Sequence, residues 1–69
     1  MTFRTAVKAI CSDWDYHESA MSMDMKGRRY RTYKILPGWA RNPTLPECLA
    51  IAYYCGMRYS NGYFYKEVV

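Results

Sequence analysis

The most regular alternation of apolar and polar positions lies between residues 16 and 36. Met21, Met23 and Met25 recur with a period of two, which is the spacing of side chains on one face of a β-strand. Gly27 can take the positive φ that a tight turn requires. The pattern predicts a β-hairpin that turns at Lys26-Gly27.

A two-residue turn at this point would pair Asp24 with Arg29 and Met23 with Tyr30, which fixes the two faces of the hairpin. The apolar face, expected to be buried, consists of Met21, Met23, Met25, Tyr30, Thr32 and Leu36. The polar face, expected to meet solvent, consists of Glu18, Ser22, Asp24, Arg29, Arg31 and Tyr33. A competing interpretation is a helix over residues 13–25, capped by Ser12 and ended by Gly27. The methionine alternation favours the hairpin.

The strongest local signal is Thr44-Leu45-Pro46-Glu47, a capping box in which each of Thr44 and Glu47 can bond the backbone N–H of the other. Proline is tolerated in the first turn because its missing N–H has no intrahelical acceptor there. Apolar side chains wrap most of the helix that follows: Leu45, Cys48, Leu49, Ile51, Ala52 and Cys55. Only a narrow strip of Glu47, Ala50 and Tyr54 is left to point outward, so the helix is expected to be largely buried and to end near Gly56 or at Tyr59.

The opening segment fits two patterns. Phe3, Thr5, Val7, Ala9 and Cys11 alternate as in a half-buried strand, whereas Phe3, Val7, Ile10 and Trp14 form a helical stripe. The β-branched and aromatic content favours the strand. Residues 37–44, with two prolines and a glycine, predict an ordered loop. Asn61-Gly62 predicts a turn or a left-handed cap before a last strand over residues 63–69.

These elements define an α+β fold in a single compact domain spanning residues 1–69. The expected order is β-β-β-α-β, an antiparallel β-sheet with one helix packed across one face. An uncovered edge on the C-terminal strand would invite a second copy, so a homodimer is an open alternative.

The chain is basic, with a net charge of +4 and a pI near 9.1, and its charges are segregated along its length. Six of its ten cations lie between positions 26 and 41, and four of its six acids between 13 and 24. Three cysteines cannot all pair within one chain, and the N-terminal segment lacks the pattern of a secretory leader. The longest apolar run is too short to cross a bilayer. A cytoplasmic protein with no membrane partner is expected.

The candidates for catalysis and metal binding are few. Cys48 and Cys55 fall on the apolar side of the predicted helix, where thiols pack as small hydrophobes. The three cysteines and His17 lack the short spacing of a zinc site. Asp13, Asp15, His17 and Glu18 resemble an acid/base cluster, but an acidic loop or strand start is the commoner explanation. We expect no enzyme, no cofactor and no metal.

The expected function is therefore binding, carried out by a small inhibitor or adaptor that occupies the surface of a larger protein with an acidic patch. Small inhibitors of this type are often encoded by phages or mobile elements. Arg29, Arg31 and Tyr33 would steer the encounter, and Trp39, Arg41 and Tyr54 would supply contact energy. Trp39 serves this role only if it faces solvent; the alternative is that it covers one end of the core. The competing function is nucleic-acid binding by the basic hairpin arm 26–34, which would weaken steeply with salt.

Overall fold

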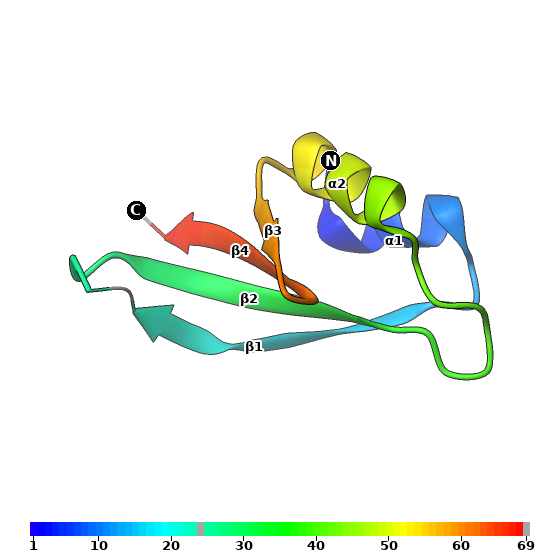
Figure 1. Ribbon diagram of the computed structural model, residues 1–69, viewed down its shortest axis with the longest axis horizontal. Coiled ribbons are helices and arrows are strands. Elements are labelled where there is room, and N and C mark those ends of the chain that lie inside the picture. The colour runs from blue at the N-terminus through cyan, green and yellow to red at the C-terminus, as the bar shows by residue number, and fades with distance from the viewer. Residues whose placement is uncertain (24, 69) are drawn as a thin grey trace.

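The computed structural model describes residues 1–23 and 25–68, with side chains for all of these except residues 20–23. The elements run in the order α1 (Phe3–Ile10), β1 (Asp15–Met23), β2 (Arg29–Leu36), α2 (Leu45–Cys55), β3 (Arg58–Ser60) and β4 (Tyr63–Val68). The strands form one antiparallel sheet in the order β1-β2-β4-β3. Both helices lie on the same side of this sheet (Figure 1). The predicted α+β class with an antiparallel sheet is confirmed, and a second helix joins the predicted one.

That second helix is α1, so the prediction of a strand for the opening segment is wrong. Thr2 caps α1, its Oγ1 accepting from the backbone N–H of Thr5 at 3.2 Å. Phe3, Ala6 and Val7 are buried, and their i, i+3, i+4 spacing places all three on one side of a helix. Packing of this stripe against the sheet outweighs the weak strand preference of the β-branched residues.

The predicted hairpin is confirmed as β1 and β2, but its register differs from the prediction. Ser22 pairs with Tyr30 and Met23 with Arg29, and the register shifts between Ser19 and Ser22. The prediction paired Met23 with Tyr30. A slip of one residue sends each side chain to the opposite face, and the alternation alone does not give the length of the connection between the strands, which sets this register.

The assignment of the two hairpin faces is accordingly wrong, although Thr32 is buried as predicted. Tyr33 and Ile35 pack into the core on the side of the helices, although Tyr33 was assigned to solvent. Met25, assigned to the core, is fully exposed, and Leu36 is also exposed. The predicted burial of Met21 and Met23 and the predicted pair of Asp24 with Arg29 fall outside the described side chains.

The capping box of α2 is confirmed. The backbone N–H of Glu47 donates to Thr44 Oγ1, and the N–H of Thr44 donates to Glu47 Oε1 at 2.9 Å. The helix ends at Cys55, one of the two predicted ends, because Gly56 takes a left-handed conformation with φ 65°. Asn61-Gly62 forms the predicted turn, which joins β4 to the short strand β3. Strand β4 lies between β2 and β3, so the expected free edge on the C-terminal strand is wrong.

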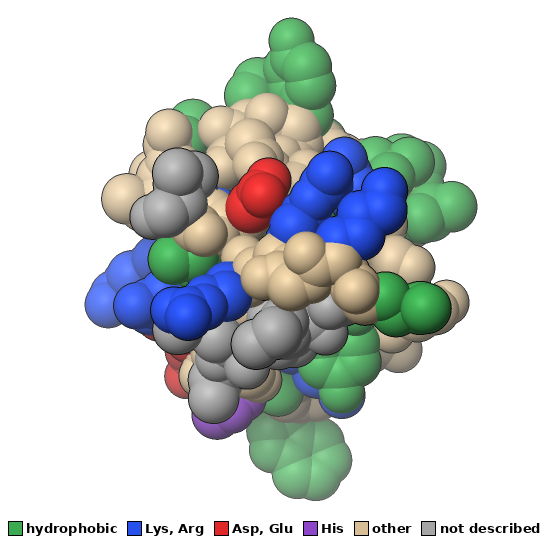
Figure 2. Space-filling model, turned by 90° about the vertical axis from the view of Figure 1, so that its left-hand side faces the viewer, with side chains coloured by type: hydrophobic (Ala, Val, Ile, Leu, Met, Phe, Trp, Pro, Cys, Tyr) green, Lys and Arg blue, Asp and Glu red, His purple; other side chains and the backbone are tan. Residues whose placement is uncertain are grey.

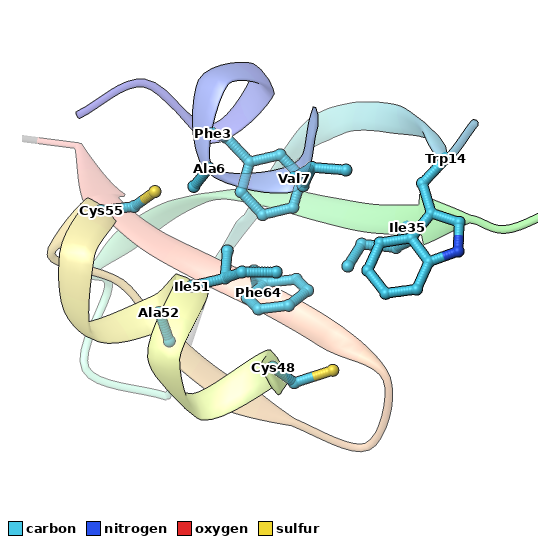
Figure 3. Packing of buried hydrophobic residues seen from close by; sticks show 10 residues of the cluster. All are labelled: Phe3, Ala6, Val7, Trp14, Ile35, Cys48, Ile51, Ala52, Cys55 and Phe64. Atoms are coloured by element: carbon cyan, nitrogen blue, oxygen red, sulfur yellow. The ribbon is translucent and has the colours of Figure 1, made fainter. Parts of the chain in front are cut away.

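The core fills the layer between the helices and the sheet (Figure 3). Its ten residues are Phe3, Ala6, Val7, Trp14, Ile35, Cys48, Ile51, Ala52, Cys55 and Phe64. Phe64 stands at its centre, with its ring centroid 4.9 Å from that of Phe3 and 4.7 Å from that of Tyr59. Trp14 is completely buried, and its indole N–H donates to the carbonyl oxygen of Arg41 at 2.7 Å. This bond ties the loop after β2 to the core.

Candidate protein-interaction surfaces

The six residues expected to bind a partner lie on three separate parts of the molecule. Arg29, Arg31 and Tyr33 belong to β2, and Tyr54 belongs to α2. Trp39 and Arg41 lie in the loop that leaves the other end of β2. Figure 1 shows the hairpin turn and this loop at opposite ends of the molecule, whose longest extent is 36 Å.

The hairpin turn and the strand ends beside it carry a cluster that we call the basic end: Lys26, Arg28, Arg29, Arg31 and Lys66. Arg31 pairs with Lys66 across β2 and β4, and it forms an ion pair with Glu18. Figure 2 shows this end of the molecule, where basic side chains gather in two groups with acidic side chains nearby. Part of the positive charge is therefore neutralised within the chain.

Tyr33 is not free beside Arg29 and Arg31. Its ring packs against Phe3 with the centroids 4.9 Å apart, and burial raises the pKa of its hydroxyl. In the sequence, Tyr33 and Ile35 are two residues apart and so lie on the same face of β2. Only the observed register shows that this face points toward the helices.

Trp39 is fully exposed at the tip of a short turn. The backbone N–H of Ala40 donates to the carbonyl of Pro37 at 3.0 Å, and Gly38 supplies the left-handed conformation with φ 59°. A shallow hollow of about 400 Å³ lies beside the indole, lined by Pro37, Gly38, Ala40 and Asp13. We call residues 37–41 the Trp39 loop. Of the two readings of Trp39, the exposed one is correct.

Arg41 fastens the Trp39 loop to α2 rather than pointing freely into solvent. Its two terminal nitrogens, Nη1 and Nη2, each donate to one carboxylate oxygen of Glu47 at 2.7 Å. Its guanidinium also lies over the Trp14 ring, 5.2 Å from the centroid. The hydrogen bond from Arg41, joined by the one from the Thr44 backbone, lowers the pKa of Glu47 to about 2. Arg41 therefore acts as a positioning residue for the loop.

Exposed apolar side chains lie along the outer side of α2 and on the adjoining part of α1. They are Met1, Ile10, Leu45, Leu49, Tyr53 and Tyr54, which we call the helix face; their exposed fractions are 70%, 36%, 60%, 51%, 81% and 62%. The prediction that α2 is largely buried is wrong for Leu45 and Leu49. Between the helices runs a groove of about 260 Å³, whose walls include Ala9, Ala50 and Tyr54. The sequence signal for this surface was the apolar character of α2 on all sides.

The side of the sheet that no helix covers (Figure 1) carries part of the GRRYRTYK segment, residues 27–34. Tyr30 meets Tyr65 edge to face, with ring centroids 6.4 Å apart. Lys34 Nζ lies 5.6 Å from the centre of the Tyr63 ring. The side chains of this segment are thus divided between the two faces of the sheet, because Arg29, Arg31 and Tyr33 point to the side of the helices.

The titratable residues considered for chemistry are dispersed. Cys48 and Cys55 are buried in the core as predicted, and burial raises the pKa of each thiol. His17 and Glu18 are adjacent in β1 and so point to opposite faces of the sheet. Within the described residues, no group of three or more histidine, cysteine, aspartate or glutamate side chains is placed to hold a metal ion.

The chain matches no family model, no curated protein sequence and no solved structure. Neither helix in the described part of the chain has the length and apolar character needed to span a membrane.

Proposed function

We propose that this protein is a non-catalytic binding protein, an inhibitor or adaptor that acts by occupying the surface of a larger protein. The observation that supports this function best is Trp39, a fully exposed tryptophan on a loop held at both ends. Tryptophan is among the residue types that dominate binding energy at protein interfaces. An exposed tryptophan that the fold does not need for its own core is available for such a contact.

The Trp39 loop lowers the entropic cost of binding. Pro37 restricts the backbone, and the hydrogen bond from Ala40 to Pro37 closes the turn. The carbonyl of Arg41 accepts from Trp14, and its guanidinium donates to Glu47. Little freedom is lost when such a loop meets a partner, so more of the contact energy appears as affinity.

The basic end supplies the electrostatic part of the proposal. Its cations would draw the protein toward an acidic patch and raise the association rate more than the final affinity. Because Trp39 and the basic end lie at opposite ends of a molecule 36 Å long, a partner that contacts both must have a surface of comparable length. This geometry favours a protein larger than the chain itself.

The test is affinity capture from the natural host cell with the immobilised wild type, Trp39→Ala and Met25→Ala. Met25 is a matched control because it is also fully exposed and apolar but lies at the hairpin turn. We expect one protein to be retained by the wild type and by Met25→Ala, to resist raised salt and nuclease, and to be lost with Trp39→Ala. Equal retention by Trp39→Ala would refute the assignment of Trp39.

Nucleic-acid binding is the second candidate, supported by the uncovered side of the sheet, where three tyrosines adjoin Lys34 and Arg58. Aromatic rings beside cations are the usual platform for single strands. Against it, Asp15 and Glu67 share this side by strand alternation, and Tyr30 and Tyr65 turn edge to face toward one another.

The two functions differ in salt dependence. Fluorescence anisotropy of labelled single- and double-stranded DNA and RNA, repeated at several salt concentrations, distinguishes them. Binding at physiological salt with a steep salt slope, weakened in an Arg29→Ala, Arg31→Ala double variant or in Lys34→Ala, would favour the nucleic-acid function. If the protein binds a partner protein instead, we expect only a weak attraction to nucleic acid that vanishes above low salt.

A further inference from the structure

We propose that the helix face is a dimer interface, on which a second copy of this chain packs about a two-fold axis near Leu49. The surface is distinct from the Trp39 loop, so this inference goes beyond the proposed function. It rests on the composition of α2, on the charge around it and on the area that it exposes.

The composition of α2 is unusual for a helix on the surface of a monomer. A helix that packs on one side normally carries polar residues on the other, and a helix that is apolar all round is normally buried all round. In α2 the inward residues are Cys48, Ile51, Ala52 and Cys55. The outward residues Leu45, Leu49 and Tyr53 are also apolar, although one chain leaves them exposed. A covering layer on this side would complete the burial that the sequence specifies.

The charge pattern favours a second copy of this chain as the layer that covers α2. The chain carries a net charge of +4, so two copies repel one another over most of their surfaces. The helix face contains no charged side chain, and the single charged residue of α2, Glu47, is neutralised by Arg41. Two copies can therefore meet along the α2 part of this face without bringing charged side chains of the same sign together, whereas a charged partner would find no side chain there to pair with.

The spacing of the exposed residues suits a two-fold arrangement. In a two-fold interface the same patch contacts itself. Leu45, Leu49 and Tyr53 are four residues apart, so they form one ridge along the helix. If two α2 helices cross antiparallel, Leu49 meets Leu49 of the partner subunit near the axis, and Leu45 lies toward Tyr53 of the partner subunit. The groove beside Ala9 and Ala50 lies between α1 and α2, on the side of α2 away from this ridge.

The exposed area is close to what a dimer needs. At about 200 Å² for a large side chain and the exposed fractions given above, the helix face presents roughly 700 Å² per copy. A specific interface of standard size buries about 800 Å² per partner. Such an area, rich in tyrosine and leucine, is consistent with dissociation in the micromolar range.

The test is sedimentation equilibrium of the wild type, Leu49→Lys and Leu36→Lys from low to high micromolar protein. Leu36 is a matched control because it is also a half-exposed leucine, 43% against 51% for Leu49, but lies at the end of β2. We expect a monomer–dimer equilibrium for the wild type and for Leu36→Lys. Leu49→Lys should remain monomeric, with urea unfolding at low concentration unchanged, because Leu49 is exposed in each separate chain.

A mixture of Leu49→Lys with Leu49→Glu gives an independent check of the axis. Each variant alone repels its own copy, whereas the mixture pairs opposite charges near the axis and should form a heterodimer. A wild type that stays monomeric at every concentration, a Leu49→Lys variant that still dimerises, or open-ended association without a dimer plateau would each overturn the proposal. None of these results would affect capture of a partner through Trp39, so the two proposals fail separately.

Discussion

Replacing each tryptophan by phenylalanine tests how the fold uses these two side chains. Trp14 and Trp39 are opposite cases: the first is fully buried and bonded to the loop, and the second is fully exposed. Trp14→Phe removes the indole N–H while keeping an aromatic ring in place. Trp39→Phe makes the same chemical change in solvent.

The expected loss at Trp14 follows from two contributions. The carbonyl of Arg41 loses a donor at 2.7 Å in a part-buried hydrogen bond, which costs about 0.5–1.5 kcal/mol. The smaller ring leaves a cavity, which adds about 1 kcal/mol at roughly 24 cal/mol per Å³. The total is about 1.5–2.5 kcal/mol, and since about 1 kcal/mol shifts the Tm of a domain of this size by about 4–8 °C, the Tm should fall by about 6–20 °C. Trp39→Phe should change stability by less than about 0.5 kcal/mol.

The assay is urea and thermal unfolding followed by far-UV circular dichroism, because fluorescence itself changes in both variants. All three proteins are compared at one low concentration, so that self-association contributes equally. Equal stabilities for Trp14→Phe and Trp39→Phe would refute the claim that the Trp14–Arg41 bond holds the Trp39 loop on the core.

Three further outcomes are expected. Thr44→Ala removes the cap of α2 and should destabilise the protein by about 1 kcal/mol in urea unfolding, whereas Thr44→Ser retains the hydroxyl and most of the stability. Because the hydrogen bond from Arg41 lowers the pKa of Glu47 to about 2 from its ordinary value of 4.5, the stabilisation is complete above the unfolded pKa and is lost as the pH falls from about 4.5 toward 2. Unfolding measured against pH should show this loss, and Glu47→Gln should show a smaller acid dependence over the same range. Under native conditions a thiol reagent should modify the partly exposed Cys11 before the two buried cysteines of α2, which should react only on unfolding; equal rates for all three would contradict the core placement.

The parts of the fold that could be predicted from the sequence are those specified by neighbouring residues. The capping box at Thr44, the left-handed glycine at position 56 and the turn at Asn61-Gly62 each depend on a few adjacent side chains. The positive φ of Gly27, 79°, belongs to the same group. Local chemistry determines such features, so they survive in any tertiary context.

The parts that could not be predicted depend on contacts between distant segments. α1 is a helix because Phe3 and Val7 meet the sheet and α2, and the segment alone fits either structure. The faces of β2 depend on the register beside the turn, where Met23 pairs with Arg29 rather than with Tyr30, and the alternation does not reveal that register. One local error of this kind reverses the expected exposure of Tyr33.

The candidate site was predicted in its residue types more than in its arrangement. Trp39 was singled out because proline and glycine flank it, but only the tertiary structure decides between an exposed ring and a lid on the core. Tyr54 was expected to face outward and does, but with Leu49 and Tyr53 rather than with Trp39. The apolar surface of α2 was visible in the sequence and was interpreted as burial within one chain.

The proposed function depends most directly on the exposure of Trp39. Fluorine NMR of the protein labelled with fluorotryptophan gives one resonance for each of the two tryptophans, assigned by the Trp39→Phe variant. A soluble paramagnetic agent should broaden the Trp39 resonance strongly at every protein concentration and leave the Trp14 resonance sharp. Two resonances that are equally protected would mean that Trp39 covers the core, and the proposed contact with a partner protein would have to be abandoned.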